Sequence, residues 1–333
     1  MTITSNKRIE GFGRVAIGAS MLALLAACSG DTSSSETKTE ADPAPAATVE
    51  TAPAQDAQPQ LSANEQNTAR LDAILAAQPD ETKARYQYRH PRQTLNFIGI
   101  KPGMVVADVL PGSGWYTKIL LPYLGEEGSV VGIDYALPMW SFFGDFASEE
   151  FLAARAIWPE TWSSDAQGWR SEGDASVSAV QLSSVPESIH GSVDAILMVR
   201  AFHHLNRTEE EGGFLTSGLE DMYAMLKPGG VVGIVQHRAP ESADDVWAEG
   251  DQGYVKESTV IEKMEEAGFE FEAKSEMNAN PKDQPTSEDV VWRLPPTLGT
   301  SGEDEALRAQ MIAIGESDRM TMRFRKPDGS SGS

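Results

Sequence analysis

Short apolar runs recur along the chain, and each has the length of a buried strand. They lie at 104–110, 129–135, 177–182, 193–199 and 231–237. Helical spacing of apolar residues occurs before and between them, at 67–78, 91–99, 115–125, 214–226 and 257–269. Buried strands that alternate with helices predict an α/β fold, with a mostly parallel sheet covered by helices on both faces.

Two later segments, 270–277 and 319–326, alternate like half-exposed strands, and we expect them to close a seven-stranded sheet as an antiparallel pair. The long polar segment between them, 278–318, is a candidate lid over the carboxyl edge, because loops of such length are usually functional or disordered. A second insertion at 136–176 contains Trp140, Trp158, Trp162 and Trp169. We expect these side chains mainly to pack the insertion onto the domain.

The start of the chain has the pattern of a secretory signal. Basic residues precede an apolar stretch at 15–27 that is shorter than the roughly 20 residues needed to span a bilayer. The only cysteine, Cys28, follows Leu25-Ala26-Ala27, and this sequence resembles a bacterial lipobox. We expect a lipidated, membrane-anchored envelope protein, and Ser29 favours the outer membrane, facing the periplasm. An ordinary signal peptide with a chance cysteine is the alternative.

The expected organisation is a signal peptide at 1–27, the lipidated cysteine and a tether at 28–66, one α/β domain at 67–328 and a flexible tail at 329–333. Residues 29–66 are rich in small and polar residues and lack the apolar surface that would offset ordering entropy, so we expect disorder there. The net charge of −23 argues against nucleic acid as a partner, since phosphate neutralisation needs a basic face.

A glycine turn follows the first predicted strand, at the end where open α/β sheets bind ligands. Gly112 and Gly114 flank Ser113 and would let backbone amides approach a ligand closely. Asp134 ends the second predicted strand, where a carboxylate can accept hydrogen bonds from ribose hydroxyls. Thr117 replaces the third glycine of a dinucleotide fingerprint, which argues against a dehydrogenase. A tight turn without a ligand is the alternative.

Together with LKPGG at 226–230, these residues resemble the class I S-adenosylmethionine-dependent methyltransferases. The first motif of that family, acid-x-Gly-x-Gly-x-Gly, corresponds here to 108–114, DVLPGSG. The resemblance covers about 95–326 and implies a Rossmann-like fold, S-adenosylmethionine as cofactor and a small-molecule acceptor. It also implies a set of cofactor-binding residues, namely Asp108, Leu110, Gly112, Ser113, Gly114, Asp134 and Tyr135.

A narrower resemblance, carried by 89–117, 235–240, 278–285, 290–296 and 315–327, is to a group of exported bacterial predicted methyltransferases. Leu110 stands at the position of the broad family's first glycine, where a side chain would crowd the methionine part of the cofactor. The alternative function is therefore a non-catalytic lipoprotein that keeps the fold and binds another small molecule. A scaffold without a ligand is a third possibility.

Three of the five histidines follow predicted strands on the expected ligand side. His203 and His204 follow the fourth strand, and His237 ends the fifth. In the family that this chain resembles, the turn after the fourth strand faces the transferred methyl group, so each of the three is a candidate base for the acceptor. Capping or space filling is the alternative for each. We assign no metal, because adjacent histidines on a turn seldom point toward one ion.

Overall fold

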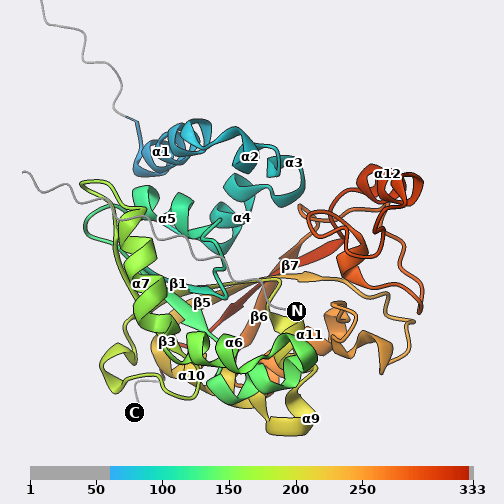
Figure 1. Cartoon of the computed structure of the whole chain (residues 1–333). Coiled ribbons are helices and arrows are strands. Elements are labelled where there is room, and N and C mark those ends of the chain that lie inside the picture. Colours follow the sequence, from blue (N-terminus) through green and yellow to red (C-terminus); the bar gives the residue numbers. More distant parts are fainter. Residues whose placement is uncertain (1–60, 330–333) are drawn as a thin grey trace, which may run out of the picture. The chain divides into compact units, whose positions relative to one another are not determined.

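The structure is a computed structural model that describes residues 61–329. One seven-stranded sheet runs through it in the order β3-β2-β1-β4-β5-β7-β6 (Figure 1). Its strands are β1 (Val105–Val109), β2 (Ser129–Asp134), β3 (Ser176–Gln181), β4 (Val193–Val199), β5 (Leu226–His237), β6 (Glu270–Ser275) and β7 (Arg319–Arg325). Neighbours pair in parallel except at β7, which is antiparallel to β5 and β6. The predicted sheet, with its antiparallel last strand, is confirmed.

Helices cover both faces of this sheet (Figure 1). The α-helices are α1 (Ala63–Ala77), α2 (Asp80–Lys83), α3 (Tyr86–Arg89), α4 (Pro91–Ile98), α5 (Thr117–Leu124), α6 (Glu149–Ala156), α7 (Trp158–Gly168), α8 (Phe202–Asn206), α9 (Glu209–Gly212), α10 (Phe214–Met225), α11 (Glu257–Glu266) and α12 (Glu305–Ile314). Short 3-10 helices are η1 (Leu137–Phe146), η2 (Glu187–Ile189), η3 (Trp247–Glu249) and η4 (Val291–Arg293).

Each face of the sheet has its own apolar cluster, because successive strand residues point to opposite faces. Val106 and Leu197 lie in the cluster that takes in side chains of α1, α4, α5 and α7. Their neighbours Ala107 and Ile196 lie in the other cluster, with side chains of η1, α8, α10 and α11. This two-sided burial explains why the parallel strands read as continuous apolar runs in the sequence.

Several boundaries differ from the sequence prediction. Helix α1 begins at Ala63 rather than 67, because Ser62 and Glu65 form a reciprocal capping box that starts the helix earlier. Strand β5 begins at Leu226 rather than 231, but its register with β4 shifts between Val193 and Ala195, so 227–230 bulge out of the pairing. The insertion at 136–176 and the segment 278–318 also contain helices that the sequence analysis did not predict.

The predicted signal peptide, Cys28, most of the predicted tether and the last residues of the tail lie outside the described residues. Between residues 61 and 329, no helix is both long and apolar enough to cross a membrane.

Candidate functional site

The strand order reverses between β1 and β4, and in open α/β sheets ligands bind at the carboxyl ends of such strands. Leu110 directly follows β1 and Arg200 directly follows β4, with φ of 51° and 57° respectively. A left-handed backbone is unfavourable for residues with a side chain, and such strain is concentrated at functional sites. The turns that follow β1 and β4 therefore each contain a strained residue at the edge of the sheet where a ligand is expected.

The glycine turn after β1 is open on one side and covered on the other. Gly112 and Ser113 are exposed, and a Cβ atom at Gly112 would meet nothing within 4 Å. Gly114 is buried, and a Cβ atom there would lie 2.3 Å from the ring of Trp169, which follows α7. With φ of 78°, this position admits only glycine without rearrangement. The insertion thus packs directly on the turn and leaves its Gly112–Ser113 side accessible.

Asp108 lies beneath this turn, only 3% exposed. Its carboxylate accepts a hydrogen bond of 2.7 Å from the Thr117 hydroxyl at the start of α5. Burial raises the pKa of Asp108 to about 7, and the hydrogen bond from Thr117 only partly offsets that effect. In this structure the predicted cofactor residue Asp108 joins the turn to the first residue of α5.

Asp134 ends β2 as predicted, but protein side chains cover its carboxylate. Arg155 of α6 lies 3.4 Å from both oxygens, and Trp140 and Gln181 donate at 3.3 and 3.4 Å. The Arg155 guanidinium also lies over the Trp140 ring, 4.2 Å from its centre. Burial raises the pKa of Asp134 while the charge of Arg155 opposes that shift. The insertion therefore occupies the carboxylate that the sequence assigns to ribose.

The predicted cofactor residue Tyr135 is fully buried in the core. Its hydroxyl donates to the carbonyl of Ala201 at 3.0 Å and lies 3.0 Å from Nδ1 of His204. Since the hydroxyl has one proton, the His204 ring donates from Nδ1. Tyr135 thus fixes the turn between β4 and α8, together with the histidine that the sequence analysis singled out.

A cavity of about 190 Å³ opens at the carboxyl ends of β4 and β5. It is lined by the three predicted histidines and by residues of the 278–329 part of the chain, among them Trp292, Leu294, Pro295 and Ser317. The segment 278–318 therefore covers the carboxyl edge, as the sequence suggested. Arg200 and Glu316 complete the polar part of the lining.

His203 is held in one tautomer by Gln236. The Gln236 amide nitrogen donates to the carbonyl of Gly253 at 2.8 Å, so its oxygen faces His203 Nδ1 at 3.1 Å and must accept from it. The proton is therefore on Nδ1, and Nε2 carries a free lone pair. Nε2 is buried and has no hydrogen-bond partner among the described residues. A buried polar atom without a partner is unusual, and the residue that carries it lines the cavity.

The three histidines are neutral in the folded protein. Burial lowers the pKa of His203 to about 4, and it lowers the pKa values of His204 and His237 well below the ordinary range. Each histidine ring also experiences positive charge from its neighbours, including Arg200. His237 Nδ1 lies 2.6 Å from the Ser317 hydroxyl, and its ring centre lies 5.5 Å from that of His203. The structure brings all three predicted histidines together.

A cluster of arginines surrounds one carboxylate beside this cavity. Glu316 pairs with Arg85 at 2.5 Å, with Arg89 at 3.3 Å and with Arg319 at 3.1 Å. Arg85 directly precedes α3, Arg89 is the last residue of α3, and Arg319 is the first residue of β7. The side chain of Glu316 is 3% exposed, so solvent only weakly screens the attraction between its carboxylate and the three guanidinium groups.

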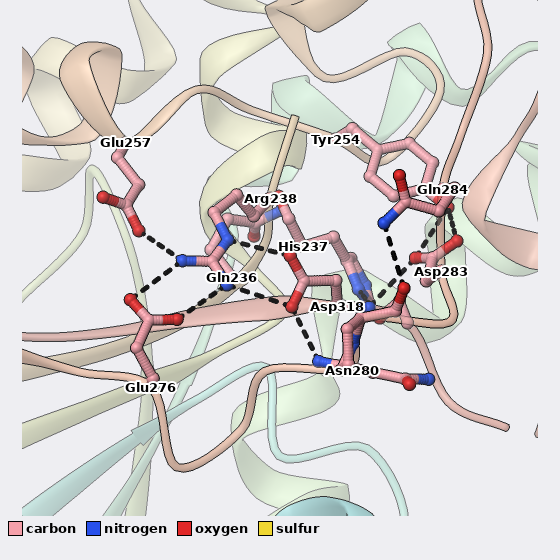
Figure 2. Close-up of polar contacts among 12 residues, drawn as sticks. Gln236, His237, Arg238, Tyr254, Glu257, Glu276, Asn280, Asp283, Gln284 and Asp318 are labelled. Carbon is pink, nitrogen blue, oxygen red and sulfur yellow. Dashed lines mark hydrogen bonds and ion pairs between the residues drawn. The ribbon is translucent and has the colours of Figure 1, made fainter. Parts of the chain in front are cut away.

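The segment 278–318 is tied to the sheet edge by Arg238, the residue after β5. Its guanidinium donates to Asp318 at 2.8 and 3.0 Å, to Glu257 at 2.7 Å and to Glu276 at 2.8 Å (Figure 2). Asp318 also accepts from the backbone of Asn280 at 2.7 Å (Figure 2). Arg238 therefore binds the last residue of the segment, Asp318, and Glu276 just before its start, and Asp318 in turn binds Asn280 near the start.

Within residues 61–329, no group of three or more histidine, cysteine, aspartate or glutamate side chains has the arrangement of a metal site. The adjacent His203 and His204 direct their Nδ1 atoms to different partners, Gln236 and Tyr135.

Comparisons with known proteins give matches among solved structures alone. A scan of protein-family models gives no match, and a search of curated proteins gives none. Among solved structures, a SAM-dependent methyltransferase from Aquifex aeolicus aligns over 78% of this chain and 98% of its own, with 17% identity and a TM-score of 0.41. An arsenic(III) S-adenosylmethionine methyltransferase from Chlamydomonas reinhardtii aligns over 79% and 75%, with 17% identity and a TM-score of 0.39.

A third structure, phosphoethanolamine N-methyltransferase 2 of Haemonchus contortus with bound S-adenosyl-L-methionine, aligns over 72% of this chain and 53% of its own. Its identity is 16% and its TM-score 0.40. At such identities and TM-scores the likeness carries no conclusion about function, which depends on the residues of the site.

Sequence reasoning missed the two arginines that dominate this site, Arg200 and Arg155. Arg200 had a signal, since it is a cation directly after the apolar run VDAILMV at a strand end. Arg155 had none, because it reaches Asp134 from an insertion whose path along the chain does not show which strand end it covers.

Proposed function

We propose that this protein is an S-adenosylmethionine-dependent methyltransferase that acts on a small molecule. The observation that carries the proposal is the placement of the accessible Gly112–Ser113 turn and of Asp134 at the carboxyl ends of neighbouring strands β1 and β2. In this strand order a glycine turn and an acid at those ends suit a ligand with an adenosine group. The donor set fits S-adenosylmethionine in kind, provided that Arg155 moves away from Asp134.

When bound, the cofactor would supply an electrophilic methyl group on sulfur. Transfer of that methyl group to the acceptor would require the acceptor to lose its proton. Positioning supplies most of the rate in such an in-line displacement. We assign the proton to His203 Nε2, because this nitrogen has no hydrogen-bond partner among the described residues and His203 lines the cavity at the carboxyl ends of β4 and β5. The proton then passes to solvent.

The test is calorimetric titration of the full chain with S-adenosylmethionine and S-adenosylhomocysteine, comparing wild type with Asp134→Asn. We expect the variant to bind S-adenosylhomocysteine about tenfold to a hundredfold more weakly, since a hydrogen bond to a charged group contributes about 1.5–3 kcal/mol. The matched control is Asp194→Asn, which removes a carboxylate paired with Lys227 at the amino end of β4. Equal affinity in wild type and Asp134→Asn would refute the cofactor site.

A second candidate is a non-catalytic binding protein that keeps the fold. It is favoured by one observation, the covering of Asp134 by Arg155 and Trp140. If neither cofactor form binds the wild-type chain at millimolar concentration, this second function replaces the first.

We also propose that the protein is anchored in the cell envelope by a lipid on Cys28, on the support of the lipobox-like sequence alone. The membrane is then a partner through the lipid, and methyl transfer in that location needs a supply of cofactor outside the cytoplasm.

A further inference from the structure

Arg200 lines the cavity but has no counter-ion of its own. Its Nε atom is buried, and no hydrogen bond joins its guanidinium to another side chain within the described part of the chain. The nearby carboxylate, Glu316, already pairs with Arg85, Arg89 and Arg319. The side chain of Arg200 is partly buried, and a cation that loses solvent without gaining a partner is costly, so Arg200 is expected to meet an opposite charge in its working state.

We propose that this cavity binds the anionic group of the methyl acceptor, a carboxylate or phosphate, through the guanidinium of Arg200. This inference names the substrate class and rests on the proposed function. A guanidinium donates two parallel hydrogen bonds to such an oxyanion, which gives direction as well as charge. The acceptor is then a small organic anion whose nucleophilic group also carries a proton.

The local electrostatics support an anion rather than a neutral ligand. Burial, followed by repulsion from Arg89 and Arg319, lowers the pKa of Arg200, which means that its charge is poorly compensated. Burial lowers the pKa of His203, and the positive charges of Arg200 and Arg207 add to that effect. A bound anion would act on both groups in the same direction, since negative charge favours protonated Arg200 and makes His203 a stronger base. Substrate binding and activation of the base are thereby coupled.

The rest of the lining indicates the body of the ligand. Val291, Trp292, Leu294, Pro295 and Pro296 are apolar residues of the lining, and the cavity volume is about 190 Å³. A small ligand with an apolar body and one anionic group matches a lining that combines these residues with Arg200. His203 lies within three residues of Arg200 on the same turn, so the proton-bearing group of the ligand would be close to its anionic group.

The test uses benzoate and its neutral isostere benzamide as probes, titrated into the full chain in chloride buffer of constant ionic strength. We expect wild type to bind benzoate at least about tenfold more tightly than benzamide, and Arg200→Gln to lose that preference. The control is Arg325→Gln, which removes the same charge at the opposite end of the sheet, where Arg325 pairs with Glu272. Equal binding of the two probes to wild type, or an unchanged preference in Arg200→Gln, overturns the anion site.

If Arg200→Gln fails to fold, the Arg200 Nε–H resonance of wild type gives the same answer by NMR. It should shift on addition of benzoate and remain in place with benzamide, and an unshifted resonance with both overturns the proposal.

A competition experiment distinguishes an acceptor's anionic group from the carboxylate of the cofactor as the partner of Arg200, because S-adenosylhomocysteine has a carboxylate of its own. Simultaneous binding of benzoate and S-adenosylhomocysteine supports the acceptor assignment. Displacement of benzoate, with S-adenosylhomocysteine affinity that depends on Arg200, overturns it in favour of the cofactor carboxylate. Benzoate binding by a protein that does not bind S-adenosylhomocysteine keeps the anion site and refutes the proposed function.

Discussion

Asp108 and Asp134 occupy similar places at the carboxyl ends of β1 and β2, yet their surroundings give them different chemistry. Asp108 has a neutral hydroxyl as its side-chain partner and a pKa raised to about 7. Asp134 has the cation Arg155 within 3.4 Å. A carboxylate with a cationic partner stays ionised more easily than one with a neutral partner, so Asp134 is the better acceptor for hydroxyl groups of a ligand.

Among single residues, His203 makes the clearest pH prediction. Its pKa is about 4 in the folded protein, against an ordinary value of about 6.5. Between these values the unfolded chain binds more protons, so His203 destabilises the fold as pH falls from 7 to 4. The free-energy difference of unfolding between wild type and His203→Gln should change by about 3 kcal/mol over that range, in the direction that disfavours wild type at low pH.

Urea denaturation of both proteins at several pH values measures this difference. The comparison with a variant is needed because Asp108 acts with the opposite sign: its folded pKa is raised, so its contribution falls as pH rises toward 7. The exposed His190, changed to Gln, is the matched control. A pH-independent difference between wild type and His203→Gln would contradict the buried, neutral state of His203.

Two helices of the insertions, α6 and α12, are among the elements that the sequence did not predict. Neither has a buried residue, so neither contributes to the apolar core. Both begin with a side-chain cap, from Ser148 and Asp304 respectively, which is the one local signal that marks them. Helix α6 is nevertheless the element that carries Arg155 onto Asp134.

From the position of α6 we predict that Arg155→Gln binds S-adenosylhomocysteine several-fold more tightly than wild type. The ribose hydroxyls and Arg155 compete for the same carboxylate oxygens, and the removal of the ion pair eliminates that competition. Isothermal titration calorimetry measures the affinity. Arg207→Gln is the matched control, since Arg207 also lies over an aromatic ring of this insertion, Phe143, but pairs with Asp251. Weaker binding by Arg155→Gln would show instead that Arg155 itself contacts the ligand.

For the whole molecule, net charge and local charge have opposite signs. The chain has a formal charge of −23, while Arg85, Arg89 and Arg319 pair with Glu316 beside the cavity that Arg200 lines. Short-range pairing in a buried site outweighs the screened field of distant surface charges. An acidic protein can therefore take an anionic ligand, and the composition alone would have suggested the reverse.

The location of the molecule gives the last prediction. If Cys28 is lipidated, the wild-type chain should sediment with the membranes of the cells that make it, and mass spectrometry should find a lipid-modified N-terminal cysteine. Cys28→Ser should lose both properties, because a hydroxyl cannot form the thioether to the lipid. Thr32→Ala is the matched control and should behave as wild type. An unmodified thiol at Cys28 in the wild-type protein would contradict the anchor.

The sequence by itself determined the sheet and the positions along it. All seven predicted strands form, and the predicted residues 108–114, Asp134, His203, His204 and His237 fall at one edge. These features follow from local rules, since a buried strand needs an apolar run and a strand end needs a turn. Their roles as cofactor and catalytic residues stay predictions.

Only the tertiary structure decided which side chains from elsewhere meet that edge. Arg155 covers Asp134, Trp169 covers Gly114, and Gln236 selects the tautomer of His203. Arg85 and Arg89 reach Glu316 across more than two hundred residues of chain. Such contacts depend on how insertions pack against the sheet, and no periodicity along one segment encodes the partner that another segment brings to it.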